Sequence, residues 1–311
     1  MLQANLVETL ARALRDHWEV PCFSDLDGPT LTYGDVANRI LRLHHIFAEC
    51  GIQQGDRIAL IGRNSAHWGV GYLAAVTYGA VIVPVLPDFT GNEMEHILRH
   101  SGSTMLLVAE SIFDQIDETK APSLKAVLGL KDFGLLFEND PRVGPALAGA
   151  DTGYVERFHS ILSRQTLEFP AQPGDRLAAI VYTSGTTGFS KGVMLEHHSL
   201  MVNVHYFNSQ VELAPGDGIV SFLPLAHAFG CAFDFLSPLI SGCHVTFIEK
   251  LPTPKILIAA FAEVRPAVVM SVPLIIEKIY RNKVKPVLET PKVKLMLKVP
   301  GLKNVVYKKI K

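Results

Sequence analysis

The chain has 311 residues, a formal net charge of −1, 48% hydrophobic residues and 19% charged residues. This balance excludes an intrinsically disordered chain, which would need low hydrophobicity and high net charge, and the length favours two domains or subdomains. Four cysteines without a CxxC pair exclude a dense disulfide framework and indicate a reducing, cytoplasmic compartment.

The N-terminal third predicts helices and strands in alternation. Its first residues, MLQANLVETLARALRDH, lack the apolar core of a signal peptide and are typical of an amphipathic helix. Asp27-Gly28 predicts a hairpin, and residues 33–50 show helical periodicity that ends at Gly51. The uncharged run 64–87 is long enough to span a membrane, but its glycines and prolines favour a buried helix near 66–79 and a buried strand, VIVPV.

The rest of the chain continues this alternation, and residues 139–153 and 163–176 are predicted to be Pro/Gly-rich connections. The predicted strands are RIALIG, TMLLVA, KAVLGL, LAAIVY, GIVSF, HVTFI and AVVMS. The predicted helices start near 91 and 196 and cover 154–163, 229–240, 254–264 and 273–282. The pattern predicts an α/β fold with mostly parallel sheets flanked by helices.

A loop rich in Gly and Thr follows the apolar strand LAAIVY. It reads Thr183-Ser184-Gly185-Thr186-Thr187-Gly188-Phe189-Ser190-Lys191-Gly192. Its glycines permit tight turns, successive backbone N–H groups can face one anion, and the Lys191 ammonium can follow a phosphate. The loop therefore predicts a polyphosphate site. It is not a Walker A motif, because Ser190 stands where that motif has Gly.

The string TSGTTGxxKG after an apolar strand resembles the phosphate loop of the adenylate-forming (AMP-binding) superfamily. Ser190 departs from that family, which usually has Pro before the Lys. The segments at 31–40, 55–87 and 222–230 are similar to other family motifs, and VPLIIEKIYR at 272–281 resembles the long-chain fatty acyl-CoA synthetase branch. The resemblance covers about residues 20–290 and implies the N-terminal large domain, with one subdomain over 1–176 and part of a second over 177–311.

The resemblance implies a ligase that uses ATP, Mg²⁺ and CoA to convert a long-chain fatty acid into an acyl-adenylate and then a thioester. His227 would contact the carboxylate and the α-phosphate, and Phe229 would line the substrate pocket. Thr183 would lie near Mg²⁺, and Lys191 would steady the triphosphate in catalysis. The ATP phosphates would be held by Thr183, Ser184, Gly185, Thr186, Thr187, Gly188 and Lys191.

Two parts of the family pattern are missing from this sequence. It has no YGxTE-like motif, which carries an adenine contact and a Mg²⁺-binding Glu, and no C-terminal lid with its Lys. We therefore expect a truncated fragment that keeps part of the ATP site and is inactive alone. A truncated sheet would also leave an open edge, which predicts self-association.

Other interpretations stay open. The loop could serve a non-catalytic nucleotide-binding module, or a ligase for another carboxylate. His227, Cys231, Cys243 and His244 could form a metal set, although their spacing matches no common zinc pattern. Residues 279–311 carry ten Lys or Arg and one acid, Glu289. This segment is either a solvated basic helix or a peripheral contact with the inner face of a membrane. No nucleic-acid partner is predicted.

Overall fold

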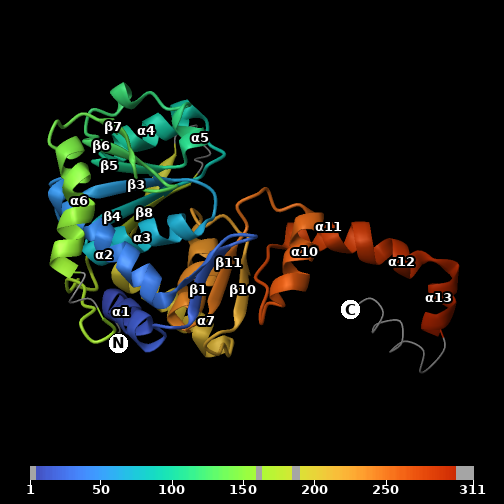
Figure 1. The fold of residues 1–311 in the computed structure, drawn as a ribbon. Coiled ribbons are helices and arrows are strands. Elements are labelled where there is room, and N and C mark those ends of the chain that lie inside the picture. Colours follow the sequence, from blue (N-terminus) through green and yellow to red (C-terminus); the bar gives the residue numbers. More distant parts are fainter. Residues whose placement is uncertain (1–4, 159–162, 184–189, 299–311) are drawn as a thin grey trace.

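Two mainly parallel β-sheets with flanking helices form the body of the protein in the computed structural model (Figure 1), which describes residues 5–158, 163–183 and 190–298. The strands are β1 (Pro21–Asp25), β2 (Thr30–Thr32), β3 (Arg57–Ile61), β4 (Val81–Val85), β5 (Met105–Val108), β6 (Ala126–Gly129), β7 (Leu135–Glu138), β8 (Leu177–Thr183), β9 (Lys191–Glu196), β10 (Gly218–Ser221) and β11 (His244–Phe247). The α-helices are α1 (Leu6–Asp16), α2 (Tyr33–Glu49), α3 (Ala66–Tyr78), α4 (Gly91–Ser101), α5 (Glu110–Phe113), α6 (Val143–Phe158), α7 (His197–Gln210), α8 (Ala228–Gly230), α9 (Ser237–Ile240), α10 (Pro254–Val264), α11 (Pro273–Ile279), α12 (Lys285–Glu289) and α13 (Pro291–Lys298). A 3₁₀ turn, η1 (Glu118–Lys120), and two π-helices, η2 (Cys231–Leu236) and η3 (Tyr280–Val284), complete the described elements.

The strand order confirms the predicted α/β class. The larger sheet has the order β7-β6-β5-β3-β4-β8-β9, and its antiparallel pairings are at the edge strands β7 and β9. The smaller sheet has the order β10-β11-β1-β2, with β2 antiparallel. Each sheet combines strands from both sides of residue 176, because β8 joins β4 and β11 joins β1. The boundary between two subdomains at residue 176 stays a prediction.

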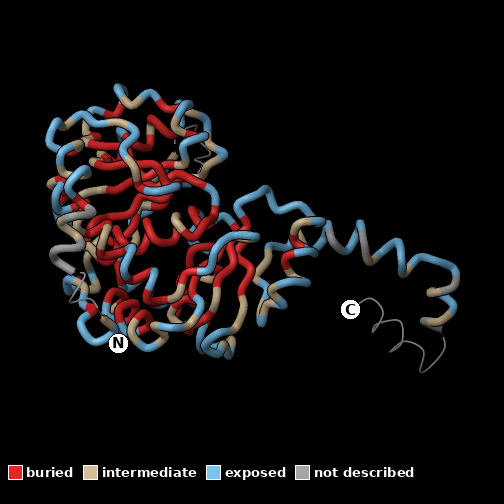
Figure 2. The backbone as a smooth tube through the Cα atoms, in the orientation of Figure 1, coloured by how far each residue is buried: buried red, intermediate tan, exposed pale blue. Residues whose placement is uncertain are grey.

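Alternation along the strands of the larger sheet separates two apolar layers. Ile58 and Leu60 of β3 pack in the cluster that contains α2 and α3, whereas Ala59 and Ile61 pack in the cluster that contains α4. This period of two is the consequence of side chains pointing to opposite faces of a strand. Figure 2 shows the central strands of this sheet as buried, with exposed residues gathered on the outer loops and the outer faces of helices.

Helix α3 lies in the core and explains the uncharged run 64–87. Ser65 caps it by accepting a hydrogen bond from the amide of Trp68, and Gly79 ends it with a φ of 88°. The Trp68 and Tyr72 rings stack 5.4 Å apart. The predicted buried helix and buried strand are confirmed, and within the described ranges no helix is long and apolar enough to cross a membrane.

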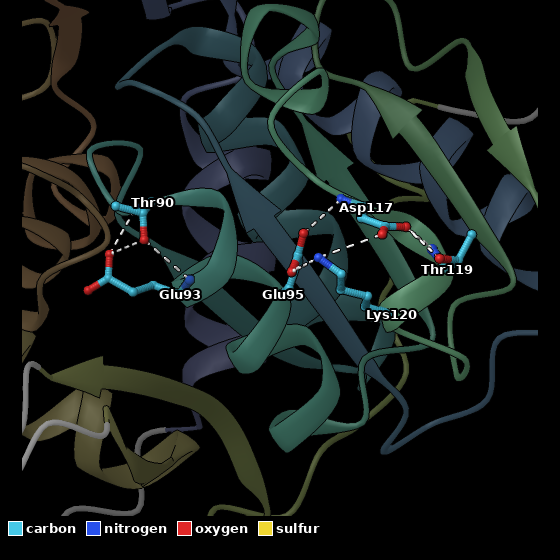
Figure 3. Close-up of polar contacts among 6 residues, drawn as sticks. All are labelled: Thr90, Glu93, Glu95, Asp117, Thr119 and Lys120. Atoms are coloured by element: carbon cyan, nitrogen blue, oxygen red, sulfur yellow. Dashed lines mark hydrogen bonds and ion pairs between the residues drawn. The ribbon is translucent and has the colours of Figure 1, made fainter.

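Polar contacts fix helix α4 and the connection that follows β5 (Figure 3). Thr90 and Glu93 form a capping box at the start of the helix. The buried Glu95 carboxylate accepts from the Asp117 amide at 3.0 Å and from Lys120 Nζ at 2.9 Å. Since a buried carboxylate needs such partners, these bonds tie α4 to η1.

Helices α11 to α13 project away from the two sheets as an extended arm (Figure 1). Apolar side chains are exposed along it: Leu274, Ile276, Tyr280, Val287 and Leu295. The predicted helix 273–282 corresponds to α11 and the first part of η3.

Several predicted elements were wrong. Residues 143–153, predicted as a connection, belong to helix α6, because buried Val143 and Ala150 pack in the core cluster and tertiary packing overrides the local Gly and Pro content. Residues 267–271 are not a strand: the Ala267 amide donates to Gly218 O at 3.0 Å, but no ladder develops beside β10. Strands β7 and β9 had not been predicted.

Candidate active site

Strands β8 and β9 form an antiparallel hairpin that frames the predicted phosphate loop. Their register runs from the Leu177–Glu196 pair to the Thr183–Lys191 pair. The predicted contacts at Ser184, Gly185, Thr186, Thr187 and Gly188 lie outside the described residues. The described ends of the loop place the exposed Thr183 side chain and the exposed Lys191 side chain on neighbouring strands.

Packing across the hairpin, from Ile180 and Tyr182 of β8, leaves little room for a side chain at Gly192. A Cβ there would lie 2.9 Å from Ile180 Cγ2 and 3.2 Å from Tyr182 Cζ. The buried Tyr182 hydroxyl lies 2.7 Å from His100 Nδ1 on α4. The hairpin base is therefore held against α4 next to the predicted loop.

A pocket of about 460 Å³ opens beside this hairpin and brings together three of the predicted site residues, Thr183, His227 and Phe229. Its remaining lining is Val181, Val193, Leu195, Leu223, Pro224, Ala228, Gly230 and Val272. The Lys191 side chain is not part of the lining, although its strand position pairs with Thr183. The pocket thus has apolar walls and polar groups from Thr183 and His227, which is the arrangement of an amphipathic small-molecule site.

The side of the pocket near His227 is built by a tight turn followed by a short helix. The His227 amide donates to Pro224 O at 3.0 Å, and the Cys231 amide donates to His227 O at 2.9 Å. Phe229 is half-exposed, and its ring contacts Phe233 edge to face at 4.8 Å. These contacts fix the backbone at His227, and its side chain is exposed at the pocket.

Two buried polar residues, Asp234 in η2 and His197 at the start of α7, were not predicted as functional. Asp234 is 1% exposed, and burial raises its pKa from 3.8 to about 7, against two backbone hydrogen bonds that lower it. His197 begins α7, as expected, and burial lowers its pKa to about 4, with a smaller contribution from Arg176. Both ring nitrogens of His197 lack a partner among the described residues.

The proposed metal set is not assembled by the fold. In the part of the chain that the structure describes, no group of three or more His, Cys, Asp or Glu side chains could hold a metal ion. Cys231 and Cys243 are buried free thiols, and burial raises the pKa of each to about 12. His244 Nε2 is instead 2.9 Å from Ser24 Oγ.

A larger pocket, of about 720 Å³, lies at the carboxyl ends of neighbouring strands but contains none of the predicted site residues. An exposed Arg63–Asp88 ion pair, with 3.0 Å between Arg63 Nη2 and Asp88 Oδ1, crosses its rim. Burial, assisted by Glu249, raises the pKa of Asp25 to about 6. This larger pocket is lined by both acidic and basic side chains and contains no residue of the predicted site. The smaller pocket at Thr183 and His227 is therefore the candidate active site.

The comparison with known families supports the fold and the motifs together. Residues 10–306 match the family described as AMP-binding enzyme. Because this match covers nearly the whole chain, the chain belongs to that family, as its motifs had predicted.

Curated relatives of this chain are acyl-CoA synthetases and ligases. Long chain acyl-CoA synthetase 5 of Arabidopsis thaliana is 26% identical, with 80% of this chain and 38% of that protein covered. The long-chain-fatty-acid–CoA ligase heimdall of Drosophila melanogaster is 27% identical, with 84% and 39% covered. The medium-chain fatty-acid–CoA ligase of Escherichia coli is 26% identical, with 84% and 44% covered. The chain therefore spans about two fifths of the length of these relatives.

Solved structures of this family share the fold. ATP-bound MatB from Rhodopseudomonas palustris superimposes with a TM-score of 0.68 at 26% identity, over 93% of this chain and 52% of that one. A red-emitting luciferase from Phrixothrix hirtus superimposes with a TM-score of 0.73 at 19% identity, over 93% and 53%. The predicted fold, the large N-terminal domain of adenylate-forming enzymes, is confirmed.

Proposed function

We propose that this chain supplies the phosphate loop and the acyl-binding pocket of an ATP-dependent acid–thiol ligase that activates a long-chain fatty acid. The observation that supports this most is the apolar pocket that brings Thr183, His227 and Phe229 together. The names of the relatives, long-chain and medium-chain acyl-CoA ligases, support the substrate class.

The proposed reaction has two half-reactions. A carboxylate oxygen of the fatty acid forms a bond to the α-phosphorus of ATP, and the bond to the bridging oxygen breaks, which releases pyrophosphate. The CoA thiolate then attacks the acyl carbon, and AMP leaves with the electron pair of the mixed anhydride bond. Both steps depend on positioning and on neutralising phosphate charge.

Lys191 and the loop before it would bind the triphosphate. The Lys191 ammonium is exposed and free to turn toward phosphate oxygens, and Thr183 adds a hydroxyl at the pocket. Mg²⁺ suits this donor set, since it usually keeps one or two protein ligands and takes the rest from substrate phosphates and water. Thr183 would hold it, and the ion would add charge neutralisation at the phosphates.

His227 and the apolar walls would bind the fatty acid. The His227 side chain can donate a hydrogen bond to the carboxylate or to the α-phosphate, while Phe229 and the valine and leucine side chains of the lining would cover the acyl chain. A volume of about 460 Å³ lies within the usual range for small-molecule sites, roughly 300–1,000 Å³.

The test compares the 311-residue chain with the complete gene product. We propose that the 311-residue chain binds ATP without turnover, since it spans only about two fifths of the length of its ligase relatives. Titration calorimetry with ATP and assays of palmitate-dependent pyrophosphate release check both halves. Turnover by the 311-residue chain would contradict the inactivity. ATP binding without activity of the complete product on any tested carboxylate would favour a non-catalytic binding module, and activity on carboxylates other than fatty acids would favour the other ligase interpretation.

The proposed location is cytoplasmic, with peripheral membrane contact through residues 279–311. Exposed Tyr280, Val287 and Leu295 stand beside basic side chains on the described part of this segment, and this combination suits an anionic lipid surface. Co-sedimentation with phosphatidylserine vesicles should be strong, sensitive to salt and lost when the segment is deleted. Equal binding after deletion would contradict the contact.

Self-association is proposed through the face that carries the open β10 edge and the arm. Apolar side chains are exposed there, including Val269, Leu274 and Ile276, and an unpaired strand edge offers hydrogen bonds to a second chain. Analytical ultracentrifugation should show concentration-dependent dimers or larger species. A single monomeric boundary at all concentrations would contradict the proposal.

A further inference from the structure

The segment Phe222–Ala226 connects β10 to the turn at His227 without regular secondary structure. It forms one wall of the pocket through Leu223 and Pro224. Its backbone groups cannot bond within a helix or sheet, and buried backbone groups need partners. The side chains that supply these partners therefore determine where the wall lies.

Asp234 holds the start of this segment from one side. Its Oδ2 accepts from the Leu223 amide at 3.1 Å and from the Phe222 amide at 3.3 Å. The residue lies in the π-helix η2, an irregular helix type that is frequent at functional sites. The second carboxylate oxygen, Oδ1, has no partner among the described residues, so the two backbone bonds are the contacts that this buried group makes there.

Asn64, which follows β3, holds the same segment through a second pair of hydrogen bonds. Its Nδ2 donates to Leu223 O at 2.8 Å, and its Oδ1 accepts from the Leu225 amide at 3.1 Å. Asn64 is buried in the loop between β3 and α3, next to the cap residue Ser65. The amide and the carbonyl of Leu223 are thus bound by two side chains that are 170 positions apart in the sequence.

The held segment leads directly to the proposed reaction centre. The His227 amide donates to Pro224 O, and a Cβ at Gly230 would lie 2.6 Å from that same oxygen. Pro224 has no N–H to satisfy and a restricted φ. A displacement of Leu223 would therefore be transmitted through this turn to His227.

We propose that Asp234 and Asn64 are positioning residues that hold the Leu223–Pro224 wall and thereby the backbone position of His227. This proposal deepens the proposed function, since it concerns the pocket that would bind the fatty acid. Neither residue lines the pocket, and both act through the backbone of Leu223.

The test compares four variants of the 311-residue chain. Asp234→Leu removes both acceptors, Asp234→Asn keeps one oxygen that can accept both amides, and Asn64→Ser removes the long two-point contact. Ser237→Ala is the matched control, because Ser237 is fully buried and follows η2, and its hydroxyl has no partner among the described residues.

Hydrogen exchange gives a readout that does not depend on ligand. We expect the Phe222 and Leu223 amides to exchange at least about tenfold faster in Asp234→Leu, and the Leu225 amide in Asn64→Ser, because a lost hydrogen bond opens these amides locally. Asp234→Asn and Ser237→Ala should exchange like the wild type. Unchanged exchange in Asp234→Leu and Asn64→Ser would overturn the proposal, as would equal acceleration in Ser237→Ala.

Binding of the fluorescent fatty acid cis-parinarate gives the second readout. Affinity should fall about fivefold or more in Asp234→Leu and Asn64→Ser and stay near the wild-type value in the other two variants. Faster exchange with unchanged affinity would overturn the positioning role and leave a purely structural one. If Asp234→Leu does not fold, the comparison of Asn64→Ser with Ser237→Ala tests the positioning role instead. If the wild type does not bind parinarate, the proposed substrate class fails. Amide hydrogen exchange at Leu223 and His227 then still decides whether Asp234 and Asn64 hold the wall in place.

Discussion

Thr183 and Lys191 occupy paired positions on the antiparallel strands β8 and β9. The residues on either side of the predicted phosphate loop therefore lie next to each other, at the end of β8 and the start of β9. Because β9 returns antiparallel to β8, the exposed Lys191 side chain is placed beside the carboxyl end of β8, where the Thr183 hydroxyl meets the pocket. This pairing puts a lysine and a threonine at opposed strand positions, which is the arrangement that the proposed binding of ATP phosphates requires.

Replacing Lys191 by Met should weaken ATP binding by about tenfold or more, since one charge-assisted phosphate contact is worth roughly 1.5–3 kcal/mol. The melting temperature should change little, because the side chain is exposed. Lys255→Met on α10 is the matched control, an exposed lysine that does not line this pocket. Calorimetric titration with ATP checks the prediction. Equal affinities of the two variants would contradict the role of Lys191.

Replacing Gly192 by Ala should destabilise the protein by about 1–3 kcal/mol, the usual cost of overpacking. The new Cβ would lie 2.9 Å from Ile180 Cγ2, and the hairpin would have to shift. Gly149→Ala is the control, because Gly149 is in helix α6 and a Cβ there meets nothing within 4 Å. That variant should gain up to about 1 kcal/mol. Urea unfolding of both variants measures the difference, and equal shifts would refute the packing argument.

Replacing His227 by Ala should lower palmitate-dependent pyrophosphate release by the complete gene product about a hundredfold, the usual cost of losing a donor at a developing charge. His227→Gln keeps a donor and should lose less. Because the side chain is exposed, unfolding of both variants should resemble the wild type. A loss that is equal for Gln and Ala would indicate that the imidazole acts otherwise than as a hydrogen-bond donor.

The pKa of Asp234 makes stability depend on pH. Burial raises this pKa from 3.8 to about 7, so the folded state binds more protons than the unfolded state between these values. The free energy of unfolding should therefore fall as pH rises from about 4 to 7, by about 1.4 kcal/mol per pH unit at most. Asp234→Asn removes this titration. Burial also lowers the pKa of His44 and of His197 to about 4, but both residues are the same in wild type and variant, so their effects cancel in the comparison. Urea unfolding at pH 5 to 8 should show the free energy of unfolding of Asp234→Asn rising relative to that of the wild type until about pH 7. A difference in unfolding free energy that is the same at every pH would contradict the raised pKa of Asp234.

The sequence pattern predicted the parts of the site that depend on local order. LAAIVY is a continuous apolar run, so its identity as a buried parallel strand was readable, and Thr183 follows it directly. The residue types predicted a phosphate-binding loop at 183–192, and the resemblance to the adenylate-forming family predicted a pocket-lining segment around His227. In the structure, Thr183, His227 and Phe229 line one pocket. Their roles stay predictions.

The unpredicted parts depend on contacts that one sequence does not reveal. Strand β9 was missed because KGVMLE does not alternate in burial, and Val193 and Met194 are exposed at the sheet edge. Asp234 gave the signal of an isolated carboxylate among aromatic residues, but its partners Phe222 and Leu223 are known only from the fold. Asn64 contacts the same segment from another sheet, and no local pattern marks it.

We propose that this pocket activates a fatty acid with ATP. The most direct measurement is ATP- and palmitate-dependent pyrophosphate release, made on the 311-residue chain and on the complete gene product. We expect both proteins to bind ATP and only the complete gene product to release pyrophosphate. If the complete product binds ATP but releases no pyrophosphate with palmitate or any other carboxylate, the ligase interpretation is wrong and the loop is a nucleotide-binding device.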